Sequence, residues 1–364
     1  MPVCTANQYV SLHTWRGVQL YQFAPSQYTE VDWGRKLRDP STCDLTVGAS
    51  DTDLDRLPDI VGWYHWLSVW DGDTDQLMWT GPIYKAVGNR GGLTINAKDH
   101  SALLARTRNP ITKRWDAADP AWIAGELWRY LIEAQGLNVA PIIRTDPEGD
   151  RYDFQVITDD KHLDQTVSDL VNLGLKWTVV SGAPIVGPLP LEAVATLGEN
   201  DFQGDGIDFV RDASAVYNDV LVRGPDNLAR AQVDYFGMNL QALVNMDNMF
   251  GVGNVQRAAK QYVRNTGSVT TKLQLPSGTV LRPDAPVSIE ELMPSARFVI
   301  EAQGIRELME LTAVDVTRRQ GTTEVKVSME ALPDRDSEGN LIELAELSAQ
   351  KQPVVTLGGQ ANSR

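Results

Sequence analysis

Three largely apolar runs, the first two rich in aromatic residues, are separated by short turns and constrain the fold of this chain most strongly. The first run, 61–70 (VGWYHWLSVW), is followed by the acidic turn 71–75 and by the second run, 76–87. The glycine-rich turn 88–92 then leads into the third run, 93–97. Aromatic and β-branched residues favour strands, whereas Asp, Asn and Gly favour turns. Closely spaced strands of this kind predict a small barrel or sandwich.

Aromatic residues occupy both faces of the first run. Trp66 and Trp70 share a face with Tyr64, while Trp63 and Leu67 take the other. Because successive strand residues point to opposite faces, this pattern indicates a strand that is buried on both sides. We therefore expect these tryptophans in a core or a subunit interface, and not in a platform for sugar rings.

Two shorter strands precede these runs, at 19–23 and 43–47. Within the second run, Gly81 and Pro82 predict a bulge or bend, because proline cannot donate a hydrogen bond to a neighbouring strand. The first β-barrel domain is expected to span residues 1–114.

Helical periodicity begins near residue 117 and predicts a mixed α/β insert over 115–204. Asp119 followed by Pro120 is typical of a helix start, and Gly136 is typical of a helix end. A second helix, a strand and a Gly/Pro-rich loop are predicted at 164–173, 175–180 and 181–190.

The composition changes after Trp177, which is the last of the ten tryptophans. Further strands are predicted at 219–223, 231–236, 268–275, 297–302, 310–317 and 323–329. One helix, 255–264, interrupts them. We expect a second β-barrel domain over 205–332 and a partly flexible C-terminal extension over 333–364. The predicted fold is mainly β: two small barrels that resemble tube domains, with an inserted mixed α/β region.

The charge balance limits the possible partners. The chain has 48 acidic and 33 basic residues, a net charge of −15. Tight binding to nucleic acid depends on basic residues that neutralise phosphates, so it is not expected. The acidity fits simple solubility, or DNA that passes close by without binding. No run approaches the ~20 apolar residues of a membrane span, and no secretory signal is apparent.

No metal or cofactor site is predicted. Cys4 and Cys43 are too few for a disulfide framework and are expected to be small, buried or partly buried apolar residues. The four histidines form no HxH, HExxH or Cys/His cluster. The glycines of 251–253 lack the third glycine of a dinucleotide-binding motif, so we expect a flexible loop there and not a phosphate cradle.

No catalytic residues are predicted either. Asp99, His100 and Ser101 carry the residue types of a catalytic triad, but triads unite residues that are distant in sequence. We expect Asp99 to cap the turn 101–105. Acidic groups occur at Asp51/Asp53/Asp55, Asp71/Asp73/Asp75, Asp159/Asp160 and Glu290/Glu291. They lie in turn-like segments, where Asp binds local backbone, so a hairpin turn at 71–75 is preferred over a glycosidase pair or a calcium loop.

Four segments follow one another in an order that a known family shares. They are an aromatic and basic segment, a break and a short strand at 28–47; a tryptophan hairpin leading to Gly-Pro-Ile at 66–83; a strand followed by D-x-x-x-L-L-x-R at 93–108; and Y-N-x-V-x-V-x-G at 217–224. In the third, Thr107 interrupts the family's basic pair. This series resembles the tail-hub or minor tail proteins of siphophages that infect actinobacteria, which are similar to the baseplate hub of contractile phages.

The resemblance, over about residues 20–332, implies a function at the tail tip of a virion. Such proteins form homotrimers, and each chain gives two related barrels to a pseudo-sixfold ring that continues the tail tube. Expected partners are further copies of the chain, the distal tail ring, the tape measure and fibre or tip proteins, with genome DNA passing through an acidic lumen without specific binding. The protein would be assembled in the host cytoplasm, would not insert into a membrane and would not be an enzyme.

Two alternatives remain open. A carbohydrate-binding adhesion module would show saturable binding to host glycans through an exposed tryptophan. A wall-degrading glycan hydrolase would need one carboxylate pair whose replacement abolishes turnover.

Overall fold

A computed structural model of the chain describes residues 3–26, 29–49, 59–146, 149–189, 192–203, 207–267, 270–274, 280–302 and 305–332. The acids at Asp51, Asp53 and Asp55 and the expected C-terminal extension over 333–364 lie outside the described residues.

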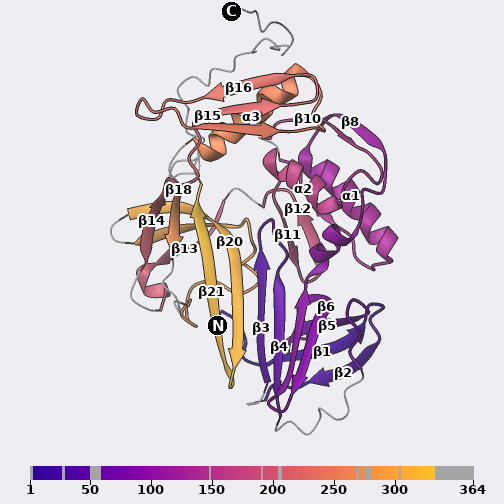
Figure 1. Ribbon diagram of the computed structural model, residues 1–364. Helices are drawn as coiled ribbons and strands as arrows, with labels where there is room; N and C mark the ends of the chain where they lie inside the picture. Colours follow the sequence, from indigo (N-terminus) through magenta and orange to yellow (C-terminus); the bar gives the residue numbers. More distant parts are fainter. Residues whose placement is uncertain are drawn as a thin grey trace, which may run out of the picture.

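A large mixed sheet forms the centre of the described structure (Figure 1). Its main path runs through β14 (Asp208–Asp212), β18 (Thr270–Gln274), β21 (Thr322–Ala331), β20 (Ile305–Arg319), β3 (Thr29–Lys36), β4 (Thr42–Gly48), β7 (Gly92–Lys98), β6 (Leu77–Asn89), β5 (His65–Asp71), β1 (Gln8–Thr14) and β2 (Gln19–Phe23). From β20 the sheet branches to β19 (Arg297–Ala302), which pairs in parallel with β13 (Ala193–Gly198).

Strand β20 joins the N-terminal and C-terminal β regions into one sheet. Its residues 313–318 pair with β3, while its opposite edge pairs with β21. Both edges of β20 are thereby occupied, so each β region extends the other. The prediction of a mainly β fold is confirmed, but the strand pairing of the described residues closes no barrel: the path ends at β14 and β2.

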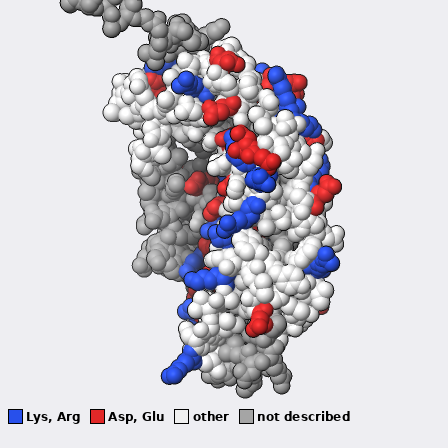
Figure 2. Space-filling view, turned by 45° about the vertical axis from the view of Figure 1, so that its right-hand side comes forward, with Lys and Arg blue, Asp and Glu red and all other residues white. Residues whose placement is uncertain are grey.

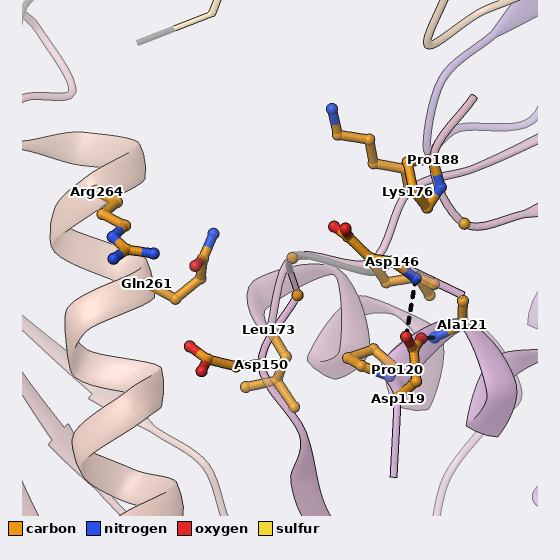
Figure 3. A pocket seen from close by; sticks show the side chains of 14 residues that line it. Asp119, Pro120, Ala121, Asp146, Asp150, Leu173, Lys176, Pro188, Gln261 and Arg264 are labelled. Atoms are coloured by element: carbon orange, nitrogen blue, oxygen red, sulfur yellow. Dashed lines mark hydrogen bonds between the residues drawn. The ribbon is translucent and has the colours of Figure 1, made fainter. Parts of the chain in front are cut away.

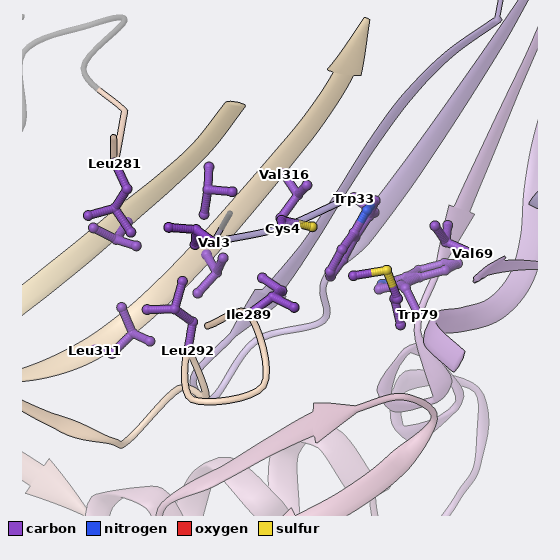
Figure 4. Packing of buried hydrophobic residues seen from close by; sticks show 14 of the residues in the cluster. Val3, Cys4, Trp33, Val69, Trp79, Leu281, Ile289, Leu292, Leu311 and Val316 are labelled. Atoms are coloured by element: carbon purple, nitrogen blue, oxygen red, sulfur yellow. The ribbon is translucent and has the colours of Figure 1, made fainter. Parts of the chain in front are cut away.

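The first hydrophobic core packs against this sheet and draws residues from both β regions. Figure 4 shows Cys4 between Val316 of β20 and Trp33 of β3. The indole Nε1 of Trp33 donates to Gln8 Oε1 at 3.0 Å, which satisfies its one polar atom. Cys4 and Cys43 are buried, as predicted; both are free thiols, and burial raises the pKa of Cys4 to about 12. The core is therefore shared by segments that are far apart in sequence.

The second hydrophobic core lies between helices and small sheets. The helices are α1 (Pro120–Gln135), α2 (Leu163–Asn172) and α3 (Val252–Thr266). The sheets contain β8 (Lys113–Ala118) with β10 (Tyr152–Val156); β11 (Trp177–Val180), β12 (Ala183–Val186) and β9 (Ile142–Ile143); and β16 (Leu228–Gln232), β15 (Asp219–Arg223) and β17 (Gln241–Asn245). Short 3-10 helices occur at η2 (His100–Arg106) and η3 (Glu199–Asp201).

The ends of α1 follow the sequence prediction. The side chain of Asp119 accepts a hydrogen bond from Ala121 N at 2.7 Å, and Pro120 occupies the first turn, where its missing N–H costs nothing. Gly136 ends the helix in the left-handed conformation, with φ +65°. Local capping chemistry thus fixes both boundaries.

Several predicted elements need correction. The first aromatic run forms a strand only from His65, because the residues before it make a turn. The irregularity expected at Gly81 and Pro82 lies between Ile83 and Lys85, where β6 pairs with β7. The glycines of 251–253 do not form a flexible loop: Gly251 is the N-cap of α3, which begins at the next residue.

The predicted loop over 181–190 contains a strand, β12. Ser181 and Gly182 both have positive φ, +50° and +79°, and connect β11 directly to β12. This is the geometry of a two-residue hairpin turn, which favours glycine. Pro184 lies within β12 opposite Val179, so the proline that suggested a loop is accommodated in a short strand.

Candidate functional site

The three neighbouring residues with triad chemistry have structural roles. Asp99 is the N-cap of η2, and its Oδ1 accepts a hydrogen bond from Ser101 N at 2.9 Å, as predicted. His100 instead packs its ring against Trp66, with the ring centroids 4.8 Å apart. Neither ring nitrogen of His100 makes a hydrogen bond with Asp99 or Ser101. Asp99, His100 and Ser101 therefore form no proton relay.

A second histidine lies in the same region. The Nε2 of His13 is 2.7 Å from Ser68 Oγ, and its Nδ1 is 2.8 Å from the carbonyl oxygen of Thr14. Burial lowers the pKa of His13, and it lowers that of His100 to about 4. Both imidazoles are consequently neutral at neutral pH and suit packing rather than acid–base exchange.

An aromatic groove of about 770 Å³ lies beside these histidines. Its lining includes Trp15, Trp66 and Trp70, and Leu137 and Val139 after α1 form part of it. We call this the tryptophan groove. It combines apolar area with a few polar groups, as binding grooves do.

Two tryptophans of the groove, Trp66 and Trp70, are held by packing against the rest of the protein. Trp70 stacks on Tyr9, with centroids 6.2 Å apart and planes at 8°, and donates Nε1 to Ser11 Oγ at 2.9 Å. Trp66 is only 6% exposed, which leaves it too enclosed for a flat sugar platform. Residues Trp66 to Val69 of β5 are all buried, which confirms the prediction of burial on both sides for this part of the run. For Trp63 and Tyr64 the prediction is wrong, because they lie in the turn before β5 and are 37% and 48% exposed.

The predicted acidic groups make structural contacts, some local and some with segments far away in sequence. Asp71 Oδ1 accepts from Asp73 N at 2.7 Å and from Thr74 N at 3.1 Å, which confirms the hairpin turn between β5 and β6. Farther along, Asp159 pairs with Arg108 at the surface, and Glu291 accepts from the backbone and hydroxyl of Ser288. The contacts of Asp71 and Glu291 are those of turns, whereas Asp73 accepts from Thr5 and Asn7 of the N-terminal segment.

A small hollow at the N-terminus of α1 collects further charged groups (Figure 3). Figure 3 shows Arg264 and Gln261 of α3 on one side and Asp146 and Asp119 on the other. Asp119 is fully engaged, because its Oδ2 accepts from Asp146 N at 2.9 Å and pairs with Arg151. Its carboxylate holds the helix start and is not free for catalysis.

The polar face of the large sheet brings carboxylates together. Asp32 of β3 lies directly opposite Asp44 of β4, and Asp315 of β20 lies opposite Gly34. Desolvation raises the pKa of Asp32, and the charges of Asp315 and Asp44 raise it further. Asn96 Nδ2 donates to Asp44 Oδ1 at 2.6 Å. This face is hydrophilic, unlike the opposite face that covers the first core.

Both signs of charge occur on the face of the molecule in Figure 2. Lys and Arg side chains follow one another in a loose line down it, and Asp and Glu side chains lie among and beside them. The net charge of −15 is therefore not expressed as a uniformly acidic surface on this side.

Among the described residues, no three His, Cys, Asp or Glu side chains cluster closely enough to hold a metal ion. Their helices also include none with the length and apolar character that a membrane crossing requires.

The segment 217–224 has a structural role that the sequence alone did not reveal. The buried Asn218 donates Nδ2 to the carbonyl oxygens of Val233, at 2.7 Å, and Met238, at 3.0 Å. Its Oδ1 accepts from Leu240 N at 2.7 Å. One side chain thus fixes both ends of the loop between β16 and β17. The glycine at the tip of this loop was the one signal in the sequence for a tight turn here, since Gly favours tight turns.

The comparisons with known proteins concern the fold. No protein-family model matches the chain, and no curated protein matches it in sequence. Among solved structures, a tail protein from Neisseria meningitidis is similar with a TM-score of 0.61 and 15% identity, over 89% of this chain and 96% of that one. The 43 kDa tail protein of prophage MuSo2 from Shewanella oneidensis has a TM-score of 0.62 and 12% identity, over 90% and 99%.

A third likeness points the same way. Prophage tail protein gp18 from Listeria monocytogenes has a TM-score of 0.53 and 11% identity, over 88% of this chain and 94% of that one. The chain therefore has the fold of phage tail proteins over nearly its whole length. Each match spans almost all of the other protein, so the likeness concerns the fold as a whole and not one part of it.

Proposed function

We propose that this chain is a structural tail-tip hub protein of a long-tailed bacteriophage and not an enzyme. The observation that carries the proposal is the likeness in fold to three tail proteins, which extends over 88–90% of this chain. The engagement of Asp99 and Asp119 in capping supports it, because these carboxylates serve the fold. We further propose that the chain belongs with the tail-hub proteins of actinobacteriophages, which the series of four segments resembles.

The proposed domains follow the sequence boundaries. Residues 1–114 and 205–332 are the two tube-forming, barrel-like domains, 115–204 is the insert and 333–364 is the extension. The adjacency of β3 and β20 supports this arrangement, because it places the two β regions side by side with their strands antiparallel. Residues 219–263 pack on the insert through α3 and the second core, and would brace the two domains.

In the proposed assembly three copies form a ring that continues the tail tube. The polar face of the large sheet, with Asp32, Asp44 and Asp315, would line the lumen, since carboxylates repel passing DNA. Distal tail ring, tape measure and fibre or tip proteins would bind the ends of the ring. The protein would belong to the virion, at the tail tip.

The test combines mass and position. Light scattering of the purified chain should give a trimer, and electron micrographs of particles that carry a gold-labelled copy should show label at the tail tip. Label along the shaft or on the capsid, or a monomer at every concentration, would contradict the proposal. Turnover of cell-wall polymer, abolished by changing one carboxylate pair, would replace it with the hydrolase.

A further inference from the structure

A short apolar loop projects from the small sheet formed by β16, β15 and β17. Phe236 at its tip is 91% exposed and Met238 is 58% exposed. Tyr235 packs its ring edge-on against Phe236, with centroids 5.2 Å apart. We call residues 234–238 the apolar finger. Two large apolar side chains in water at one tip are unfavourable, and such surfaces mark interaction sites.

The finger is held in a strained conformation. Phe236 has φ +52° and Gly237 has φ +73°. A bulky residue in the left-handed region is unusual and costs on the order of 1–3 kcal/mol. The three hydrogen bonds of Asn218 and the bridge between Tyr235 and Met238 hold the loop in place. The folded chain thus keeps Phe236 extended into solvent although its backbone conformation is unfavourable.

The same chain offers a complementary surface elsewhere. The tryptophan groove, at about 770 Å³, has room for both side chains. Aromatic edges and faces attract a phenyl ring, and a thioether packs well against indoles. Figure 1 places β15 and β16 at the opposite end of the molecule from β1 and β5, which carry the groove. A finger cannot therefore reach the groove of its own chain.

Charge supports the match. Asp234 at the base of the finger is exposed, and Arg16 on the rim of the groove is exposed as well. Arg16 lies over the Trp15 ring, 4.7 Å from its centroid, so the guanidinium sits beside the aromatic wall. When the apolar finger enters the tryptophan groove, the acidic Asp234 beside the finger would meet the basic Arg16 beside the groove.

We propose that the apolar finger of one copy inserts into the tryptophan groove of a second copy. The contact joins two different surfaces, so it is head-to-tail, and a contact of this kind closes a ring when the rotation between copies permits. The inference rests on the proposed self-assembly of the hub and names the side chains that would form its interface. Phe236 and Met238 supply the buried anchor, and Asp234 and Arg16 the polar rim.

Cross-linking tests the contact directly. The variants Phe236→Cys and Gln19→Cys, the latter on the groove lining, each add one cysteine to the chain. They are purified separately, mixed and oxidised. A covalent dimer that requires both variants is expected, because Cys4 and Cys43 are buried. The matched pair uses Leu243→Cys with Gln19→Cys; Leu243 is 62% exposed on the same small sheet but outside the finger. Equal yield from both pairs would overturn the proposal.

Self-association gives a second readout. Phe236→Asn removes the ring while favouring the left-handed backbone, so the loop keeps its shape. We expect the dissociation constant for self-association to rise on the order of 30-fold, as for an interface anchor, with no change for Leu243→Asn. If the wild-type chain and Phe236→Asn form equally stable trimers, the finger contact is wrong and the hub proposal stands. A wild-type chain that stays monomeric refutes both.

Discussion

The carboxylate Oδ2 of Asp99 accepts hydrogen bonds from both the backbone amide and the hydroxyl of Ser41, at 2.7 and 2.5 Å. The same hydroxyl accepts from the indole Nε1 of Trp79 at 3.0 Å. One buried acid therefore fastens the turn before β4 to the end of β7 and, through Ser41, to β6. The residue that suggested a triad is a structural clamp between three strands.

Asp99→Ala should destabilise the fold strongly. The change leaves two buried amides and two hydroxyls without their acceptor, and each unsatisfied group costs about 1–3 kcal/mol. We expect the free energy of unfolding to fall by about 3 kcal/mol in urea denaturation. Asp284→Ala, which removes an exposed carboxylate paired with Arg282, should cost less than about 0.5 kcal/mol. Similar losses in both variants would show that the clamp contributes little.

His100 should make the protein less stable in mild acid. Burial lowers its pKa in the folded state from 6.5 to about 4. As the pH falls below 6.5 the unfolded chain takes up a proton that the folded chain refuses, so stability declines by up to about 1.4 kcal/mol per pH unit until pH 4. His13 and His65, with pKa values that burial also lowers, add in the same direction.

Replacement by a neutral residue isolates this contribution. In thermal unfolding between pH 7 and pH 4, His100→Gln should flatten the decline, whereas His162→Gln, at the exposed N-cap of α2, should leave it unchanged. A decline of the same slope in His100→Gln and the wild type would exclude His100 as its source.

Gly81 should tolerate no side chain. A Cβ at this position would lie 1.9 Å from the carbonyl oxygen of Lys98, which is backbone and cannot move aside. Gly81→Ala should therefore lower the free energy of unfolding by about 3 kcal/mol or more, as severe overpacking does. Gly88→Ala, on the same strand with only Leu93 Cδ1 at 3.9 Å, is the control and should be nearly neutral in urea denaturation. Equal stability of the two variants would show that β6 can shift away from β7.

Features fixed by neighbouring residues were predictable from the sequence. The start of α1 at Pro120 and its end at Gly136 depend on chemistry within a few residues. Strands at Asp219–Arg223 and Arg297–Ala302 were predicted with the bounds that the structure has. The hairpin at Ser181 and Gly182 was predictable by the same means, but the prolines around it favoured a loop.

Features that depend on distant partners were not predictable. Nothing local in β3 shows that its edge pairs with β20, about 280 residues later, because strand pairing depends on the whole sheet. The tryptophan groove likewise needs β1, β5 and the residues after α1 to meet. The role of Asn218 was hidden for the same reason, since its partners Val233 and Met238 follow 15 and 20 residues later.

Asp32→Asn should stabilise the protein at neutral pH. Asp32 and Asp44 face each other on adjacent strands, and like charges in that position are destabilising by about 0.2–1 kcal/mol. The pKa of Asp32 is raised in the folded state. The free energy of unfolding of the wild type is therefore lowered only at pH values above the pKa that Asp32 has in the unfolded chain, where its carboxylate ionises. We expect Asp32→Asn to gain about 0.5 kcal/mol at pH 7 and nothing near pH 3, where the wild type is protonated. Paired urea titrations at the two pH values measure this, with Asp284→Asn as an exposed control. A gain that persists at pH 3 would mean that packing, and not charge, is responsible.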